Sequence, residues 1–395
     1  MKKSLQIGLI YLINYFAVLG CVSEYTAELP LYETGILVVE GTILSNREVD
    51  FYFSKSIPLN SDISSAEYKN VKVDLYVVGS NGYRSLKATC WDEGLHRITL
   101  PELDENVSYG IEFEYEGETY RSELSIPQQT PPIDSVNWKQ VEYEGDISLH
   151  VSLHNEGNEP VYLFWSLDED YEITSFYRAT LFIDERRDIL YEDDSAPNYY
   201  CWKKSRNSKV IVGSTKALTE NRLINHTIYK FQPSDERFHV LYSPLIRQRA
   251  ISKAAYEYYL NKAQINQEVG GLFTPQPSEL ESNICCVTNS SKKVIGFVDV
   301  CMNIEEERLF ISAEELTIPE RIGNCNIIKM DEMVNNKEIN ELTYTQLRFH
   351  WKMNPVGTVL IDFKPTSIWA DLECSDCREM GGTKNKPDFW LNDHQ

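Results

Sequence analysis

The sequence lacks the short motifs that mark the common hydrolytic and nucleotide-dependent sites. It holds no Gly-x-Ser-x-Gly elbow, no His-Glu-x-x-His pair and no Asp-x-Asp-x-Asp-Gly calcium loop. A Gly-Gly-Thr-Lys stretch at Gly381 lacks the spacing of a phosphate-binding loop. We therefore expect a protein that is not an enzyme and that holds no metal or cofactor. A hydrolase with carboxylates scattered along the chain stays as the weakest alternative, because such pairs leave no local motif.

The chain also has few basic residues relative to acidic ones. The chain has 38 Lys and Arg against 60 Asp and Glu, so its formal net charge is −22, or −24 without Lys2 and Lys3. Such a body is repelled by nucleic acid and by anionic lipid headgroups, which argues against a nucleic-acid partner. Acidic runs such as Asp168-Glu169-Asp170 are interpreted as solvated loops.

Long apolar runs are missing except at the start of the chain. Lys2 and Lys3 precede an apolar run over residues 5–19, and Val18-Leu19-Gly20-Cys21 follows. Basic, apolar and small-residue segments in this order are typical of a secretory signal peptide. The run is shorter than the roughly 20 residues that a membrane-spanning helix needs.

The cysteine that ends this leader is similar to the lipid-attachment site of bacterial lipoproteins. We expect cleavage before Cys21 and acylation of its thiol and its new amine, which gives the stable anchoring that a single acyl chain cannot give. The prediction is a signal peptide over residues 1–20 and a lipid-anchored tether over residues 21–34. The covalent lipid on Cys21 is the one attached group that we expect, and the membrane is its first partner.

Eight further cysteines follow an export signal, which permits disulfides whose pairing the sequence does not reveal. Cys374-Ser375-Asp376-Cys377 has three interpretations. A zinc site would need a second close pair, and a redox centre would need a strand-helix context with a flanking aromatic residue. A structural disulfide region is favoured, with Cys325 or Cys201 as possible partners. The candidate disulfide cysteines are Cys201, Cys301, Cys325, Cys374 and Cys377.

Alternating apolar and polar residues dominate residues 35–132. Val71-Lys72-Val73-Asp74-Leu75-Tyr76-Val77 alternates cleanly, and Glu116-Gly117 between two such runs is typical of a short hairpin turn. Period-two runs separated by Gly and Asn turns predict an antiparallel β-sandwich of the immunoglobulin-like or transthyretin-like kind. Gln128-Gln129-Thr130-Pro131-Pro132 is the predicted linker, since two prolines hold the chain extended.

A larger β-rich domain with one main helix is predicted over residues 133–395. Helical spacing of apolar residues predicts a helix near residues 252–268, with Ser252 as its N-cap. Val294-Ile295-Gly296-Phe297-Val298 is expected to close this second domain, and the tail holds the paired cysteines. His150 and His154 share a strand face, but no third ligand is nearby, so we expect two exposed histidines and no metal.

Several short stretches lie along the chain in a specific order. In chain order they are Leu37-Val38-Val39-Glu40-Gly41, Pro132-Ile133-Asp134-Ser135-Val136, Arg247-Gln248, Gly270-Gly271-Leu272-Phe273, Gln276-Pro277-Ser278, Asn283-Ile284, Val294-Ile295-Gly296-Phe297, Cys374-x-x-Cys377-Arg378, Gly381-Gly382 and Pro387-Asp388-Phe389-Trp390. Together they resemble one family of Bacteroidota outer-membrane lipoproteins, the domain-of-unknown-function family 4249. Ser282 departs from the glycine expected there, and Cys285-Cys286 is peculiar to this chain.

The resemblance implies association with TonB-dependent outer-membrane transporters that carry a transthyretin-like N-terminal extension. It supplies no ligand and no catalytic residue. The leading hypothesis is an accessory or capping partner of such a transporter in nutrient uptake, anchored in the outer membrane and facing the cell exterior. The alternative is a surface lipoprotein that binds a glycan or a peptide by itself. Candidate partner contacts are Tyr199, Tyr200, Trp202 and Phe273.

Overall fold

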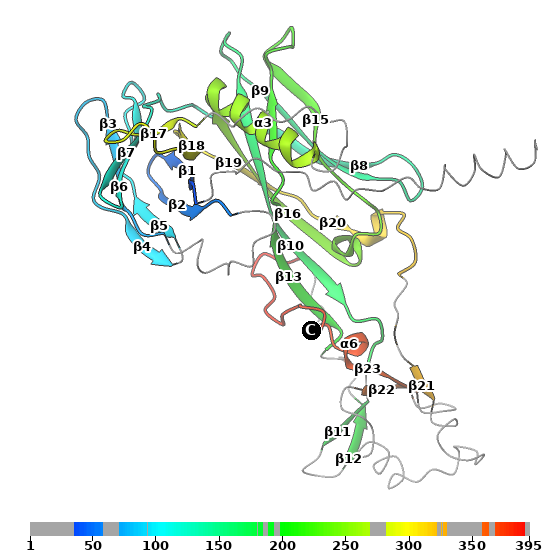
Figure 1. Ribbon diagram of the computed structural model, residues 1–395. Coiled ribbons are helices and arrows are strands. Elements are labelled where there is room, and N and C mark those ends of the chain that lie inside the picture. The colour runs from blue at the N-terminus through cyan, green and yellow to red at the C-terminus, as the bar shows by residue number, and fades with distance from the viewer. Residues whose placement is uncertain are drawn as a thin grey trace, which may run out of the picture.

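The computed structural model describes residues 35–57, 71–92, 94–179, 181–184, 189–192, 198–268, 282–321, 325, 327–329, 358–362 and 368–391. Within these ranges the chain is mostly β-structure with one main helix, and two stacked-sheet bodies carry an extended arm (Figure 1). The predicted fold class is confirmed. None of the described helices is both long enough and apolar enough to cross a membrane.

The first body is a β-sandwich. One sheet has the order β18-β1-β2-β5-β4 and the other β17-β7-β6-β3. The strands are β1 (Leu37–Leu44), β2 (Glu48–Lys55), β3 (Asp74–Gly79), β4 (Thr89–Asp92), β5 (Leu95–Thr99), β6 (Tyr109–Tyr115), β7 (Glu118–Ser122), β17 (Ile284–Cys286) and β18 (Val294–Cys301).

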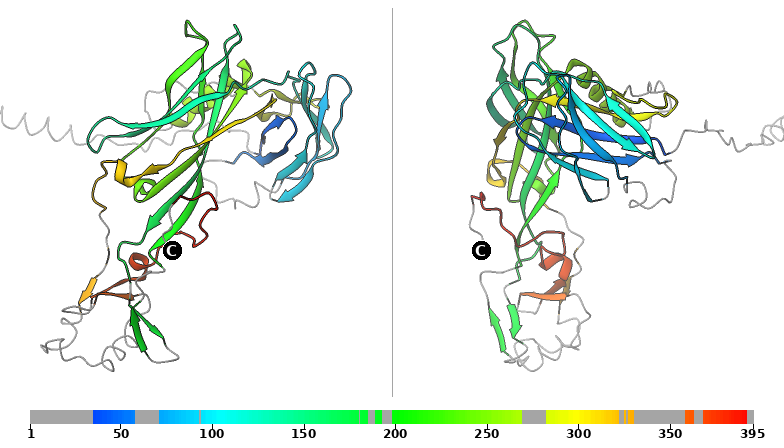
Figure 2. Two further views of the ribbon diagram at one scale, coloured as in Figure 1. Left: turned by 180° about the vertical axis from the view of Figure 1, so that it is seen from behind. Right: turned by 90° about the vertical axis from the view of Figure 1, so that its left-hand side faces the viewer.

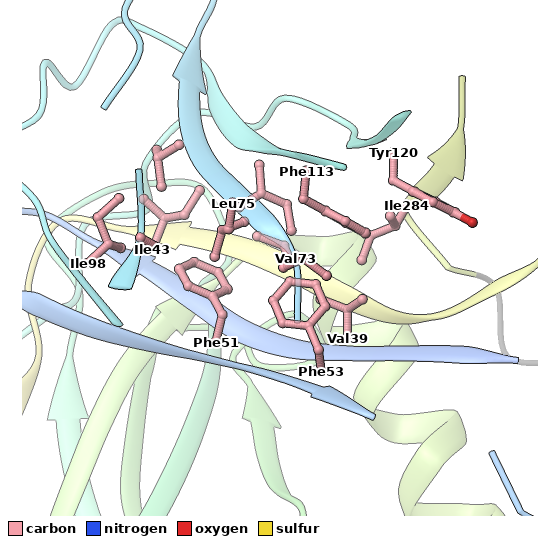
Figure 3. Packing of buried hydrophobic residues seen from close by; sticks show 14 of the residues in the cluster. Val39, Ile43, Phe51, Phe53, Val73, Leu75, Ile98, Phe113, Tyr120 and Ile284 are labelled. Atoms are coloured by element: carbon pink, nitrogen blue, oxygen red, sulfur yellow. The ribbon is translucent and has the colours of Figure 1, made fainter. Parts of the chain in front are cut away.

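Alternate residues of these strands fill the space between the two sheets (Figure 3). Phe53 of one sheet meets Phe113 of the other edge to face, with ring centroids 5.0 Å apart. Glu116 and Gly117 both have positive φ, 51° and 80°, as a two-residue type I′ hairpin turn requires. The period-two pattern and the turn prediction are both confirmed.

Two strands of this sandwich come from much later in the chain. β18 pairs with β1 in parallel, and β17 pairs with β7. The expectation that residues 294–298 close the second domain is therefore wrong. Since β18 is buried on nearly every residue, it needs cover on both faces, and the edge of the first sandwich provides it. The sandwich predicted for residues 35–132 is completed only by residues 284–301.

The second body packs a three-stranded sheet, β15-β9-β8, against a larger sheet with the order β13-β10-β16-β19. β14 also pairs with β10, and β20 with β16. The elements are β8 (Ile133–Gln140), β9 (Ile147–His154), β10 (Tyr162–Thr174), β13 (Tyr200–Arg206), β14 (Ile211–Ser214), β15 (Arg222–Phe231), η1 (Glu236–Phe238), β16 (Leu241–Ile251), β19 (Glu305–Arg308), β20 (Ile311–Ser312) and η2 (Ala313–Glu315).

The acidic run that was interpreted as a solvated loop lies inside β10. Glu169 is 1% exposed and Glu172 is fully buried. Tyr242 donates its hydroxyl to Glu169 at 2.6 Å, and the Trp390 indole donates to Glu172 at 3.2 Å. The loop interpretation is therefore wrong. Buried carboxylates are tolerated here because donors from neighbouring elements surround them.

The helix α3 (Lys253–Glu268) lies where the sequence predicts it. The Ser252 hydroxyl accepts a hydrogen bond from the Ala255 backbone N at 3.1 Å, so the predicted N-cap is confirmed. Tyr258 packs on Phe297 of β18, while Tyr259 packs on Phe164 of β10. The helix therefore contacts both bodies.

An arm projects from the second body. β10, β13 and β16 run out of its core and lead to small sheets and a short helix at the far end, away from the first sandwich (Figures 1 and 2). These outer elements are β11 (Leu181–Asp184), β12 (Ile189–Glu192), β21 (Ile327–Lys329), β22 (Thr358–Asp362), β23 (Ile368–Asp371) and α6 (Leu372–Ser375).

Candidate functional site

A cleft of about 500 Å³ lies between the two bodies. One side is the outer face of β1 and β2, the other is the face of β10 and β16, and α3 closes one end. Pockets of this size at the joint between domains are a common place for small ligands. The cleft is therefore the best candidate functional site.

Strand alternation decides which side chains face this cleft. On β10, Phe164, Ser166 and Asp168 line the cleft, whereas Leu163, Trp165 and Leu167 are buried in the core on the other side. The register places Arg249 of β16 opposite Phe164 and Arg247 opposite Ser166. Cross-strand neighbours thus form a floor of alternating aromatic, polar and charged groups.

Aromatic rings form the wall at the α3 end. Phe164 and Tyr259 have ring centroids 4.9 Å apart, and Tyr258 lies 5.4 Å from Phe297. Burial raises the pKa of Tyr258, so its hydroxyl stays protonated at neutral pH. Flat rings of this kind can contact the apolar face of a sugar or an aromatic ligand.

Charged groups occupy the opposite end. Asp168 accepts a hydrogen bond from Arg206 Nε at 2.8 Å and is also bonded by Arg247. Arg247 Nε contacts Glu306 at 2.9 Å. The hydrogen bond to Asp168 raises the pKa of Arg206. This network fixes the side chains of the cleft floor in place.

The joint beneath the cleft is held by buried hydrogen bonds. Gln248 accepts from the Trp165 indole at 2.8 Å and donates to the Pro131 carbonyl at 2.9 Å. Thr130 Oγ1 accepts from the Ala250 backbone N at 2.9 Å and donates to the Asn303 carbonyl at 2.6 Å. The predicted linker is also bonded to the first body, because the Gln128 backbone N donates to the Val300 carbonyl of β18 at 3.0 Å. These bonds fix the walls of the cleft relative to each other.

The predicted partner contacts fall elsewhere. Tyr199 and Tyr200 are half-buried at the root of the arm, with ring centroids 4.8 Å apart. Trp202 is only 2% exposed and packs against Leu241 and Trp390, so its prediction as a surface contact is wrong. The strand that holds it is covered by the C-terminal tail, because Thr383 bridges to it. Phe273 lies outside the described residues.

Two disulfides are present, as the cysteine count predicts. Cys201 is bonded to Cys377 and Cys325 to Cys374, so the two sulfurs of the Cys-x-x-Cys stretch serve different partners. Cys301 is a free, buried thiol, and its prediction as a disulfide cysteine is wrong. It lies at the end of β18, where its Sγ donates to the Asn303 carbonyl at 3.0 Å.

Of the two histidines of β9, His154 is exposed as expected, whereas His150 is not. His150 is buried and bonded to Ser148 Oγ at 2.9 Å, because β15 covers it. His154 is exposed and lies 2.7 Å from Asp134 Oδ1. Across the described ranges, no group of three His, Cys, Asp or Glu residues is placed to hold a metal ion. Cys21 lies outside the described residues.

The resemblance drew attention to Arg247-Gln248 but not to the cleft that these residues form with β1 and β2. Arg249 was missed altogether, since nothing local separates it from other strand residues.

A search of curated proteins finds no match. A family model matches residues 22–307, a span that includes every residue lining the cleft and ends before Cys325, Cys374 and Cys377. The chain therefore belongs to the family described as Domain of unknown function (DUF4249).

Proposed function

We propose that this protein is a surface-exposed outer-membrane lipoprotein that acts as an accessory or capping partner of a TonB-dependent transporter. The observation that carries the proposal is the leader that ends at Cys21, taken with family membership. Acyl chains on Cys21 would hold the protein in the same membrane as a transporter. Two partners tethered in this way meet at a high effective concentration, so even a weak contact surface is enough.

The arm supports a docking role. It projects beyond both cores and leads from β13 to small sheets at its end (Figure 2). Both disulfides lie here, and Cys201–Cys377 joins the root of the arm to the C-terminal tail. Covalent links of this kind limit the motion of an extended surface and so reduce the entropy that a contact would cost.

Co-purification tests the proposal. The tagged full-length protein is expressed in its own cells and isolated from membranes in mild detergent after cross-linking. We expect a TonB-dependent transporter to be recovered with the wild-type protein and to be strongly reduced with Cys21→Ala, which lacks the anchor. Recovery of no transporter with lipidated wild-type protein would contradict the proposal.

The cleft favours a second candidate function. Its aromatic wall, its charged floor and its fixed joint fit a binding protein for a small glycan or peptide. This function is compatible with the first, because an accessory lipoprotein can hold the nutrient that its transporter takes up.

A further inference from the structure

Arg249 is held in the cleft by aromatic rings. Its guanidinium carbon lies 4.3 Å from the ring centroid of Phe164 and 5.7 Å from that of Tyr259. Its Nη2 reaches the Tyr259 hydroxyl only at 3.5 Å, which is a weak hydrogen bond. Cation–π contacts of this kind hold a guanidinium flat without using up its donors.

The other arginines of the cleft already have carboxylate partners. Arg206 and Arg247 share Asp168, and Lys262 is paired with Glu40. In the described ranges no ion pair joins Arg249 to a carboxylate, and its Nη1 is buried without a hydrogen-bond partner. Arg249 is thus an arginine of the cleft that lacks a carboxylate partner and has one unsatisfied donor.

Asp299 lies behind Arg249 without bonding to it. Asp299 is 1% exposed, its Oδ2 accepts from the Ser252 backbone N at 2.9 Å, and its Oδ1 has no partner within the described residues. Burial raises the pKa of this carboxyl, against the effects of the Ser252 hydrogen bond and the Arg249 charge. Asp299 can balance part of the Arg249 charge through space, but it forms no hydrogen bond with the guanidinium.

We propose that Arg249 is the anchor for the carboxylate of a small ligand bound in the cleft, with the ring portion of that ligand against Phe164, Tyr258 and Tyr259. The proposal rests on the second candidate function, since it names the chemistry of that same cleft. A guanidinium offers paired donors that match the two oxygens of a carboxylate.

The charges around the cleft favour a single negative charge on the ligand. Four carboxylates, Glu40, Glu48, Asp50 and Asp168, line the cleft together with its five basic residues. A doubly charged phosphate would meet repulsion from these acids, whereas one carboxylate needs one unpaired guanidinium. A uronic acid residue and the C-terminal carboxylate of a short peptide share this chemistry.

Calorimetric titration of the full chain tests the assignment. The probes are methyl galacturonoside, which carries one carboxylate, and its neutral methyl ester, and the peptide N-acetyl-Gly-Gly-Phe as free acid and as neutral amide. We expect one of the two acids to bind at least about tenfold more tightly than its neutral form. Arg249→Gln should abolish that preference without weakening the neutral form, and Arg249→Lys should keep part of it because it keeps the charge.

Arg222→Gln is the matched control, because it removes an exposed arginine that is paired with Glu220 outside the cleft. It should bind like the wild type, and the thermal melting of each variant shows whether it is folded. An acid preference that survives in folded Arg249→Gln, or that is absent from the wild type, would overturn the role of Arg249. Failure of the wild type to bind any probe would overturn the cleft as a site for such ligands, while leaving the transporter partnership to its own test.

Discussion

Replacing Gly296 with alanine is expected to lower the free energy of unfolding by about 4 kcal/mol. Gly296 has a φ of 142°, a region that residues with a side chain rarely adopt. An added Cβ would lie 2.0 Å from the Val39 carbonyl oxygen, inside the parallel pairing of β18 with β1. The backbone of β18 would have to move away from β1, and the first sandwich would lose the strand that completes it.

Urea denaturation followed by tryptophan fluorescence measures this loss. Gly157→Ala is the control, because the φ of Gly157 is not positive and its new Cβ would meet only the side-chain amide of Asn155, whose Nδ2 and Oδ1 lie at 3.4 and 4.0 Å. It should unfold like the wild type. An unchanged urea midpoint for Gly296→Ala would show that β18 does not pair with β1 in this register.

The double variant Cys201→Ala, Cys377→Ala is expected to lose a similar amount, about 4 kcal/mol. The disulfide joins residues 176 positions apart, so it removes much conformational freedom from the unfolded chain. It also ties the C-terminal tail to β13, the strand that leads into the arm. The loss is measured by urea denaturation under oxidising conditions.

Cys285→Ala serves as the control, since Cys285 is an exposed free thiol. It should leave the urea midpoint unchanged. Reductant should destabilise the wild type more than the double variant, because the double variant already lacks the Cys201–Cys377 bond. Equal stability of the double variant and the wild type under oxidising conditions would show that this bond does not stabilise the fold.

Features set by neighbouring residues could be predicted from the sequence. The alternation in β2 and β6, the hairpin at Glu116-Gly117 and the Ser252 cap of α3 each depend on a few adjacent positions. These predictions are confirmed because each depends on local backbone geometry and not on distant residues.

Features that depend on residues distant in the sequence could not be predicted from it. The run at β18 is visibly apolar, but a run of that kind does not say which strand it joins. The run Asp168-Glu169-Asp170 looks like a solvated loop until Tyr242 and Arg308 reach it from other elements. The cleft could not be predicted for the same reason. Arg249 becomes a candidate ligand contact only because Phe164 and Tyr259 lie beside it and because it has no carboxylate partner in the described ranges.

For the cysteines, the presence of disulfides could be predicted from the sequence, but their pairing could not. An even number after an export signal predicts disulfides, and two of them are present. Their pairing depends on how the tail returns to β13. Cys301 fits the count as well as the others do, but it ends β18 beside Asn303 and Thr130 and remains a thiol.

The proposed partnership depends most on the lipid anchor at Cys21, since it requires that the protein share a membrane with its transporter. Mass spectrometry of the native protein, purified from membranes and digested, measures this directly. The predicted result is a mature chain that begins at Cys21 and carries acyl groups on its thiol and its amine. An unmodified Cys21, or a chain that retains residues 1–20, would contradict the account.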